Sequence, residues 1–182
     1  MEQKEIRSML EQVARGTMDV DSALLKLKEA PYEDIGFAKI DTHRGLRQGA
    51  AEVIYGAGKT GMQIAGIAET MWKNGQKTIL ITRMDASKAK LVAEKLPLTY
   101  YEDCRVGIVG SMPEPDSQGT ILVATGGTSD VPVAEEAALT AEALGNHVVR
   151  LYDVGVAGLH RLLSHLDEIM SAKVIVAIAG ME

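Results

Sequence analysis

The 182-residue chain has one cysteine, Cys104, and aromatic residues make up only 4% of it. A lone cysteine forms neither an internal disulfide nor a cysteine-based zinc site, which agrees with a reducing compartment. Binding of nucleic acid normally requires a basic surface and often stacking rings. Since 19 basic and 25 acidic residues give a net charge of −6, we expect no nucleic acid partner.

Long apolar runs are also missing. No stretch approaches the roughly 18 to 20 apolar residues that cross a bilayer, and the charged start MEQKEIRSML differs from a secretory signal. We therefore expect a cytoplasmic protein without a membrane partner. The acidic balance still permits a small anionic ligand, because helix N-termini bind anions through backbone amides.

Two amphipathic helices are predicted at the start of the chain. Apolar residues recur at helical spacing over residues 2–15, and Gly16 follows as a stop. Asp19 or Asp21 then caps a second helix, which Pro31 keeps from extending. These helices form an N-terminal appendage to the rest of the chain.

Strands and helices alternate after this appendage. The sequence predicts strands at residues 35–40, 52–55, 78–82 and 105–109 with helices at 59–73 and 86–96, and later strands at 120–124, 147–152 and 174–179 with helices at 132–144 and 159–170. Such alternation indicates an α/β fold with parallel strands joined by right-handed crossovers. The last strand, VIVAIAG, lacks polar alternation, as expected of a strand covered on both faces.

A loop divides the chain into two predicted domains. Residues 111–119 (SMPEPDSQG) collect Pro, Gly, Ser and acidic residues, which is typical of a linker. We predict a small α/β domain with two leading helices at residues 1–115 and a parallel-sheet domain at residues 119–182. Because the sequence stops directly after a buried strand, where an open α/β domain normally supplies another helix, the second domain is expected to be truncated at its C-terminus.

Residues 56–61 (GAGKTG) follow a predicted strand, open a helix and fit the G-x-G-x-x-G pattern of dinucleotide binding. A Walker A loop is disfavoured, because Val53 stands where its first glycine belongs. Arg83 stands near the place of the acid expected after the next strand, which suits NADP if the pattern is functional. The alternative is that the glycines only permit a tight turn.

The stronger candidate for ligand binding is the loop TGGTSD, which follows an apolar strand and precedes a helix that Pro132 opens. Glycines let a ligand approach the backbone, hydroxyls add donors, and helix amides attract an anion. The alternative is that Ser129 or Asp130 merely caps the helix. We predict a phosphate-bearing ligand here, bound by Thr125, Gly126, Gly127, Thr128, Ser129 and Asp130.

A second candidate segment, residues 153–161 (DVGVAGLHR), lies at the carboxyl end of the next predicted strand. Open α/β sheets bind ligands at that edge, so we predict that Asp153 and Gly155 contact the substrate. Arg161 can clamp a carboxylate or phosphate, and His160 can move a proton near neutral pH. The alternative is that the His-Arg pair lies on a solvated helix surface.

A third cluster is basic and lies in a predicted loop. His43, Arg44 and Arg47 are predicted to meet the other charged groups of the ligand, although a solvated face explains them equally well. Cys104 has no activating histidine near it in the sequence and is interpreted as structural. The remaining histidines fit no metal-ligand spacing, so no metal site is proposed.

Four stretches, in order, carry a resemblance to a known family: DTHRGLRQGAAEVIYGAGKT, ATGGTSDVPVAEEA, LYDVGVAGLHRLL and AIAGME. They run from Asp41 to the last residue. On them the chain resembles the nickel-pincer-nucleotide carboxylase/hydrolase family called LarB, whose C-terminal domain is related to phosphoribosylaminoimidazole (AIR) carboxylase, PurE. The resemblance implies that the second domain is PurE-like, with a flavodoxin-like parallel sheet.

The resemblance also implies a reaction. Family members carboxylate the pyridinium ring of nicotinic acid adenine dinucleotide, using carbon dioxide or bicarbonate, and cleave the phosphoanhydride to release AMP. The product is a pyridinium biscarboxylate mononucleotide, a precursor of a nickel cofactor. An electron-poor pyridinium does not attack carbon dioxide until a cysteine thiolate adds to the ring and makes an enamine carbon. No covalently bound cofactor is implied.

Individual roles follow from the same resemblance. Glu182 matches the family's Gly-Met-Glu segment and is implied to take the ring proton, and His160 and Arg161 match the His-Arg pair shared with AIR carboxylases. The family's nucleophilic cysteine lies in a segment later than residue 182, so Cys104 does not inherit that role.

Three rival interpretations stay open on the sequence. AIR carboxylase itself ranks second, because its later Ala-Gly-Gly-Ala-Ala-His motif is replaced here by residues 179–182 (AGME). An NADP-dependent oxidoreductase rests only on GAGKTG and Arg83, and a non-catalytic nucleotide sensor is the third. Related carboxylases assemble through their core domains, so we expect a homo-oligomer held by the PurE-like domain.

Overall fold

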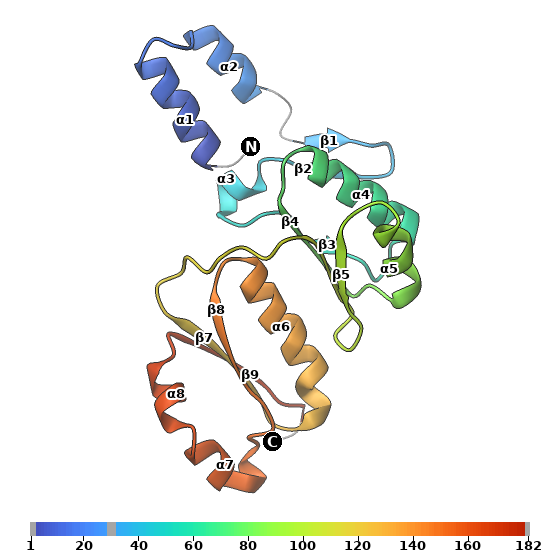
Figure 1. Cartoon of the computed structure of the whole chain (residues 1–182), viewed down its shortest axis with the longest axis vertical. Coiled ribbons are helices and arrows are strands. Elements are labelled where there is room, and N and C mark those ends of the chain that lie inside the picture. Colours follow the sequence, from blue (N-terminus) through green and yellow to red (C-terminus); the bar gives the residue numbers. More distant parts are fainter. Residues whose placement is uncertain (1–2, 29–31, 181–182) are drawn as a thin grey trace.

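The computed structural model describes residues 3–28 and 32–180. The side chains of Gln3, Lys4, Lys28, Leu46 and Arg47 lie outside the described set, as does all of Glu182. Within it the protein is an elongated α/β structure, with a pair of helices at one end, a first sheet in the middle and a second sheet at the other end (Figure 1). The predicted fold class is thereby confirmed.

The two leading helices are α1 (Gln3–Ala14) and α2 (Val20–Lys28). Asp19 caps α2, since its carboxylate accepts the backbone N–H of Ser22 at 2.8 Å and the Ser22 hydroxyl at 2.6 Å. Met9 and Ala23 are the buried side chains of the pair. The prediction of an amphipathic helix pair is confirmed.

The single strand predicted at residues 35–40 is wrong. The chain instead forms an antiparallel hairpin of β1 (Tyr32–Asp34) and β2 (Lys39–Asp41). Gly36 makes the turn at a φ of +85°, which favours glycine, and Ile35 N donates to Ala38 O at 3.0 Å. The following segment, predicted as a loop, contains a one-turn helix, α3 (Arg44–Gln48).

The first sheet has the strand order β3-β4-β6-β5 and is mixed, not all parallel as predicted. Its strands are β3 (Ile54–Tyr55), β4 (Thr78–Thr82), β5 (Leu98–Tyr101) and β6 (Val106–Gly110). Only β3 and β4 are parallel; β6 runs antiparallel to both β4 and β5. Strand β5 was not predicted. It is joined to β6 by a tight hairpin, which forces the two strands to pair antiparallel.

Helices cover both faces of the first sheet. On one face α4 (Gly61–Lys73) and α5 (Ala86–Ala93) pack against alternate residues such as Ile79 and Ile81. On the other face Leu80, Val106 and Ile108 pack against Leu139. This alternation is the period of two that a strand imposes on its side chains.

The second sheet is parallel throughout, with the order β8-β7-β9. Its strands are β7 (Thr120–Thr125), β8 (His147–Leu151) and β9 (Val174–Ile178). Helix α6 (Val131–Ala143) packs on one face, and α7 (Leu159–Leu163) and α8 (Leu166–Ser171) pack on the other. The prediction of a parallel sheet is confirmed for this part of the chain.

Two details of the second sheet differ from prediction. The helix predicted at residues 159–170 is divided at Ser164 and His165, where the Ser164 hydroxyl donates to Arg161 O at 2.7 Å and competes with helix continuation. The last strand is not covered on both faces, because Val174 and Ile175 are 50% and 48% exposed. Among the described residues β9 pairs with β7 alone, so it forms an edge of the sheet.

Helix α6 belongs to both halves of the molecule. Leu139 lies in the core of the first sheet, while Ala134 and Ala138 lie in the core of the second. An ion pair of 2.9 Å joins Arg83 Nε, at the end of β4, to Glu136 Oε2 on α6. Residues 111–119 form a connection without helix or strand between the two sheets.

Candidate functional site

The candidate site lies at the carboxyl ends of the three parallel strands, which meet near the end of the molecule marked C (Figure 1). Three segments converge there: the loop after β7, the loop after β8 and the residues that follow β9. Backbone hydrogen bonds join Val154 N to Thr125 O at 3.0 Å and Gly126 N to Ile178 O at 3.0 Å. The two segments predicted at residues 125–130 and 153–161 are therefore brought together.

Thr125 and two glycines make this junction tight. The buried Thr125 hydroxyl accepts the backbone N–H of Asp153 at 2.9 Å, so Thr125 holds the neighbouring loop and does not face solvent. Gly155 N donates to Gly126 O at 2.8 Å, and a Cβ on Gly155 would lie only 2.6 Å from that oxygen. Glycine is needed at residue 155 for this backbone approach.

The next turn presents donors toward solvent. Thr128 and Ser129 lie in a single 3₁₀ turn, η1 (Thr128–Asp130), directly before α6. Among the described residues, no hydrogen bond occupies either hydroxyl. Asp130 stands at the N-cap position of α6 without a capping hydrogen bond there, but its carboxylate accepts the Gly127 N–H at 3.0 Å and so caps the start of η1. Hydroxyls, backbone amides and a helix start together suit an anionic group.

Asp153 and Arg161 form the other half of the site. Asp153 has a φ of +59°, a left-handed conformation that costs a non-glycine residue roughly 1–3 kcal/mol and is typical of functional sites. Arg161 Nη1 donates to Asp153 Oδ2. A Cβ on Gly158 would lie 2.5 Å from Arg161 Nε, so this glycine gives the guanidinium its room. His160 is exposed on α7 beside Arg161.

The basic cluster at residues 43–47 lies elsewhere. His43 and Arg44 stand at α3, beside the first sheet, whereas the strand ends of the second sheet lie at the opposite end of the molecule (Figure 1). The structure therefore does not bring them to the candidate site within one chain. Arg44 Nε is buried without a hydrogen-bond partner among the described residues, and the Arg47 side chain is outside them.

The GAGKTG loop has a structural explanation. A Cβ would lie 2.9 Å from Thr82 O at Gly56 and 2.6 Å from Leu91 Cδ1 at Gly61, so both glycines permit close packing. Lys88 Nζ occupies the loop carbonyls, at 3.0 Å from Gly56 O and 3.3 Å from Ala57 O. This favours the tight-turn interpretation of the loop.

The geometry around the GAGKTG loop does not support NADP binding. Arg83, which would have to meet a 2′-phosphate, is paired with Glu136 on α6. The hydroxyl of Thr60 accepts Gln63 N at 3.2 Å, while Gln63 Oε1 accepts Thr60 N at 2.9 Å, so the start of α4 is capped from within the chain.

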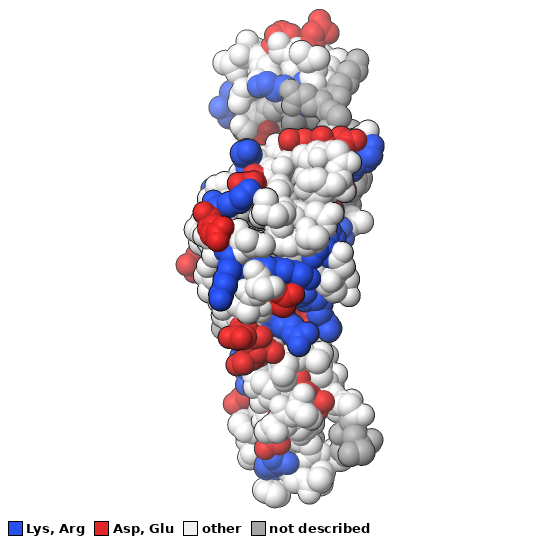
Figure 2. Space-filling model, turned by 90° about the vertical axis from the view of Figure 1, so that its right-hand side faces the viewer, with Lys and Arg blue, Asp and Glu red and all other residues white. Residues whose placement is uncertain are grey.

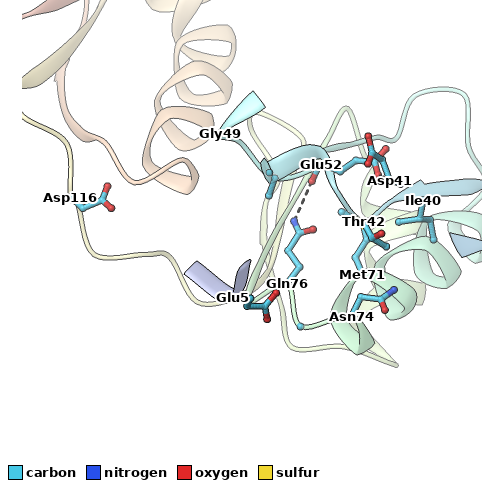
Figure 3. A pocket seen from close by; sticks show the side chains of 13 residues that line it. Glu5, Ile40, Asp41, Thr42, Gly49, Glu52, Met71, Asn74, Gln76 and Asp116 are labelled. Atoms are coloured by element: carbon cyan, nitrogen blue, oxygen red, sulfur yellow. Dashed lines mark hydrogen bonds between the residues drawn. The ribbon is translucent and has the colours of Figure 1, made fainter. Parts of the chain in front are cut away.

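A cavity of about 380 Å³ lies away from the candidate site, between α1, α3, the end of α4 and the connecting loop (Figure 3). Its ionisable lining residues are all acidic: Glu5, Asp41, Glu52 and Asp116. Burial raises the pKa of Glu52, whose Oε2 accepts the Asp41 N–H at 2.7 Å. Sequence reasoning missed this cavity, because its walls come from four separate segments.

Cys104 is unsuited to nucleophilic chemistry in this arrangement. It is 6% exposed and packs in the core that contains Leu139, and burial raises the pKa of its thiol. A thiol must ionise to attack, and a raised pKa opposes that. The structural interpretation of Cys104 agrees with this placement.

Charge is distributed unevenly over the surface. On the face in Figure 2, Lys and Arg gather over the middle of the molecule and are sparse at the lower end, where the candidate site lies. The cationic side chain predicted to bind substrate there is Arg161, and no broad basic surface surrounds it on this face. Within residues 3–28 and 32–180, no group of three or more His, Cys, Asp or Glu side chains is arranged to hold a metal ion.

No helix in the described part of the chain has the length and apolar character needed to span a membrane. Comparison with known proteins gave two findings. Residues 32–111 match the family described as the LarB/PurE-like N-terminal domain. An uncharacterized protein of Methanocaldococcus jannaschii is 34% identical over 191 residues, a match that covers 98% of this chain and 73% of that protein.

Proposed function

The chain belongs to the LarB family, and on that premise we propose that it carboxylates the pyridinium ring of nicotinic acid adenine dinucleotide and cleaves the phosphoanhydride. Family membership alone supports a carboxylase-type enzyme of the LarB/PurE-like kind. The observation that carries the finer proposal is the convergence of residues 125–130 and 153–161 at one sheet edge, with free hydroxyls on the first segment and Arg161 on the second.

In this proposal different residues of the site bind different anionic groups of the substrate. The amides and hydroxyls of Thr128 and Ser129 hold a phosphate oxygen at the start of α6. Arg161, oriented by Asp153, holds a second anionic group, either the other phosphate or the ring carboxylate. The backbone N–H groups of Gly126 and Gly127 are already engaged by Ile178 O and Asp130 Oδ2, so these two glycines shape the loop around the ligand.

Proton transfer is the second task. Carboxylation forms a carbon–carbon bond at the ring and releases the proton from the same carbon, so a base must accept that proton. We assign this role to Glu182, with exposed His160 as the group that exchanges protons with solvent. Water attacks the phosphoanhydride in the other half-reaction, and AMP leaves. The substrates are the dinucleotide and carbon dioxide or bicarbonate.

The thiolate that activates the ring is not Cys104, which is buried. We assign the addition to the cysteine that the family carries in a later segment. After carboxylation and loss of the ring proton, the carbon–sulfur bond breaks, so the pyridinium forms again and the thiolate is released. Incubation with ¹³C-bicarbonate and nicotinic acid adenine dinucleotide, followed by mass spectrometry, tests the proposal. The 182-residue chain should bind the dinucleotide without turnover, and the protein with the later segment should form the dicarboxylated mononucleotide and AMP. Turnover by the 182-residue chain would contradict this assignment and favour Cys104.

AIR carboxylase activity is the second candidate, because the matching family is described as LarB/PurE-like. The same assay with aminoimidazole ribonucleotide distinguishes the two. Carboxylation of that substrate, without reaction of the dinucleotide, would replace the leading proposal.

We also propose a homo-oligomer formed through the second sheet. Its outer helices and edge strand expose large apolar side chains, namely Leu159, Leu163, Leu166, Met170, Val174 and Ile175. Exposed apolar side chains gathered on neighbouring elements of one sheet are typical of interfaces. Light scattering during gel filtration should give a mass above that of one chain, and Met170→Glu should reduce it.

A further inference from the structure

Asp130 joins two segments that are far apart in the sequence. Its Oδ2 accepts the backbone N–H of Gly127 at 3.0 Å, and its Oδ1 accepts the backbone N–H of Gly180 at 3.2 Å. Gly127 is three residues before Asp130, whereas Gly180 is fifty residues after it and follows β9. One carboxylate thus connects the glycine loop to the end of another strand.

The surrounding backbone agrees with such a connection. Gly126 N donates to Ile178 O at 3.0 Å, and a Cβ on Gly126 would lie 3.1 Å from Ala179 Cβ, so the two segments already touch. Asp130 does not use its side chain to cap α6. Both carboxylate oxygens are instead engaged by amides of the two segments.

A direct ligand contact explains Asp130 less well. Each of its two carboxylate oxygens already accepts a backbone N–H, one from Gly127 and one from Gly180. The glycine loop, by contrast, needs a restraint, because glycine has more backbone freedom to lose than any other residue. A loop that is fixed before binding loses less entropy when the ligand arrives.

We infer that Asp130 is a positioning residue, whose carboxylate locks the loop at residues 125–130 to the end of β9 and so sets the donors of Thr128 and Ser129 relative to Gly180. This inference deepens the proposed function and rests on it for the part that concerns the ligand. The connection itself is a property of the ligand-free protein and is testable without one.

The sharpest test changes Gly180 and leaves Asp130 intact. Gly180→Pro removes the N–H donor, whereas Gly180→Ala keeps it and places a Cβ at 3.5 Å from Asp130 Oδ1, an ordinary contact. In amide hydrogen exchange followed by NMR, Gly180→Pro should speed exchange at Gly127 by about tenfold or more, because losing a hydrogen bond to a charged group weakens the lock. Gly180→Ala should not. Unchanged exchange at Gly127 in the proline variant overturns the inference.

A second test changes the carboxylate. Asp130→Asn presents one oxygen and one NH₂ group, so exchange should rise at both Gly127 and Gly180, and calorimetry should show affinity for nicotinic acid adenine dinucleotide about tenfold lower. Asp167→Asn, the same chemical change on α8, serves as the control and should alter neither. A loss of affinity without faster exchange at either amide means that Asp130 contacts the ligand directly, which overturns the inference. If the unchanged protein does not bind the dinucleotide, the proposed function fails, and the exchange experiment still decides the role of Asp130.

Discussion

The two sheets of this protein differ in how completely they are covered. Ile79, Ile81 and Val109 of the first sheet are fully buried between helices on both faces. The second sheet buries Leu122 and Val123 of its central strand but leaves half of the side-chain surface of Val174 and Ile175 exposed on its edge strand. A similar alternation of strand and helix in the sequence thus produces a closed core in one case and an open one in the other.

The two sheets also differ in the polar groups at the ends of their strands. At the end of the first sheet, Lys88 donates a hydrogen bond to a loop carbonyl, and Arg83 and Glu136 form an ion pair with each other. At the end of the second sheet, the hydroxyls of Thr128 and Ser129 are free among the described residues. The polar groups at the end of the first sheet are thus satisfied within the chain, whereas the second sheet leaves hydroxyl groups free to meet a ligand.

The largest expected effect is on the free energy of unfolding, and it compares a buried isoleucine of the first sheet with a half-exposed isoleucine of the second. Ile81→Ala should lower the free energy of unfolding by about 4 kcal/mol, because it removes buried methyl groups and leaves a cavity. Ile175→Ala makes the same change at a half-exposed position and should cost about 1 kcal/mol. Urea denaturation monitored by circular dichroism measures both. Because the proposed homo-oligomer would cover β9, both variants are measured at a dilution at which light scattering gives the mass of one chain. Equal costs there would contradict the contrast between the sheets.

The next largest expected effect is a loss of ligand affinity and concerns the loop at residues 125–130. Gly127→Val combined with Ser129→Ala should weaken binding of nicotinic acid adenine dinucleotide by about 2 kcal/mol, through a blocked backbone approach and a lost donor. The fold has room for the change, since a Cβ on Gly127 meets no atom closer than 3.9 Å. Calorimetry gives the affinity, and Ser171→Ala on α8 is the control. Unchanged affinity would remove the loop from the site.

A smaller effect is expected where the two sheets are joined. The Arg83–Glu136 pair is partly exposed, at 53% and 20% of the two side chains, so solvent screens it. A double-mutant cycle with Arg83→Ala and Glu136→Ala should give a coupling energy of about 0.5 kcal/mol. A coupling above about 2 kcal/mol would show that α6 is held to the first sheet by charge more than by Leu139.

The smallest expected effect is on the pH dependence of stability and concerns Glu52, a partly buried carboxylate beside the first sheet. Glu52 accepts one backbone N–H, and burial raises its pKa above the ordinary value of 4.5. The folded protein therefore keeps this proton to higher pH than the unfolded chain, and the stability that the proton adds is present below pH 4.5 and lost as the pH rises through the raised value.

Glu52→Gln removes this titration. The variant should gain stability relative to the unchanged protein between pH 4 and pH 7, as followed by urea denaturation at both values. A relative loss of stability over that range would mean that the charged form of Glu52 is favoured in the fold.

Sequence patterns predicted the helices and the parallel sheet well, because both follow from local periodicity. They failed where a strand was short or carried a mixed pattern. β5 has the sequence LTYY directly after Pro97 and was missed, and its hairpin with β6 reversed the pairing of the first sheet. The exposure of β9 was also mispredicted, since an apolar run does not say what packs against it.

For the site, the sequence identified the two segments that meet at the sheet edge, because the carboxyl ends of parallel strands lie side by side. It could not separate residues that face a ligand from residues that hold the loops. The side chains of Thr125 and Asp130, both predicted to bind substrate, accept backbone N–H groups within the protein. Nor could it tell that the cluster at His43 and Arg44 lies far from the other two segments, because that distance depends on the arrangement of the two sheets.

Helix α6 has a consequence for how the chain is made. All four strands of the first sheet precede residue 111, whereas the helix that covers one face of this sheet begins only at Val131. At roughly 5–20 residues per second, a few seconds separate the synthesis of the sheet from that of Leu139. During that interval Leu80, Val106 and Ile108 have no covering helix and are open to other nascent chains. A ribosome-bound chain halted just before α6 should therefore bind a chaperone that recognises apolar surface, and release it once α6 emerges.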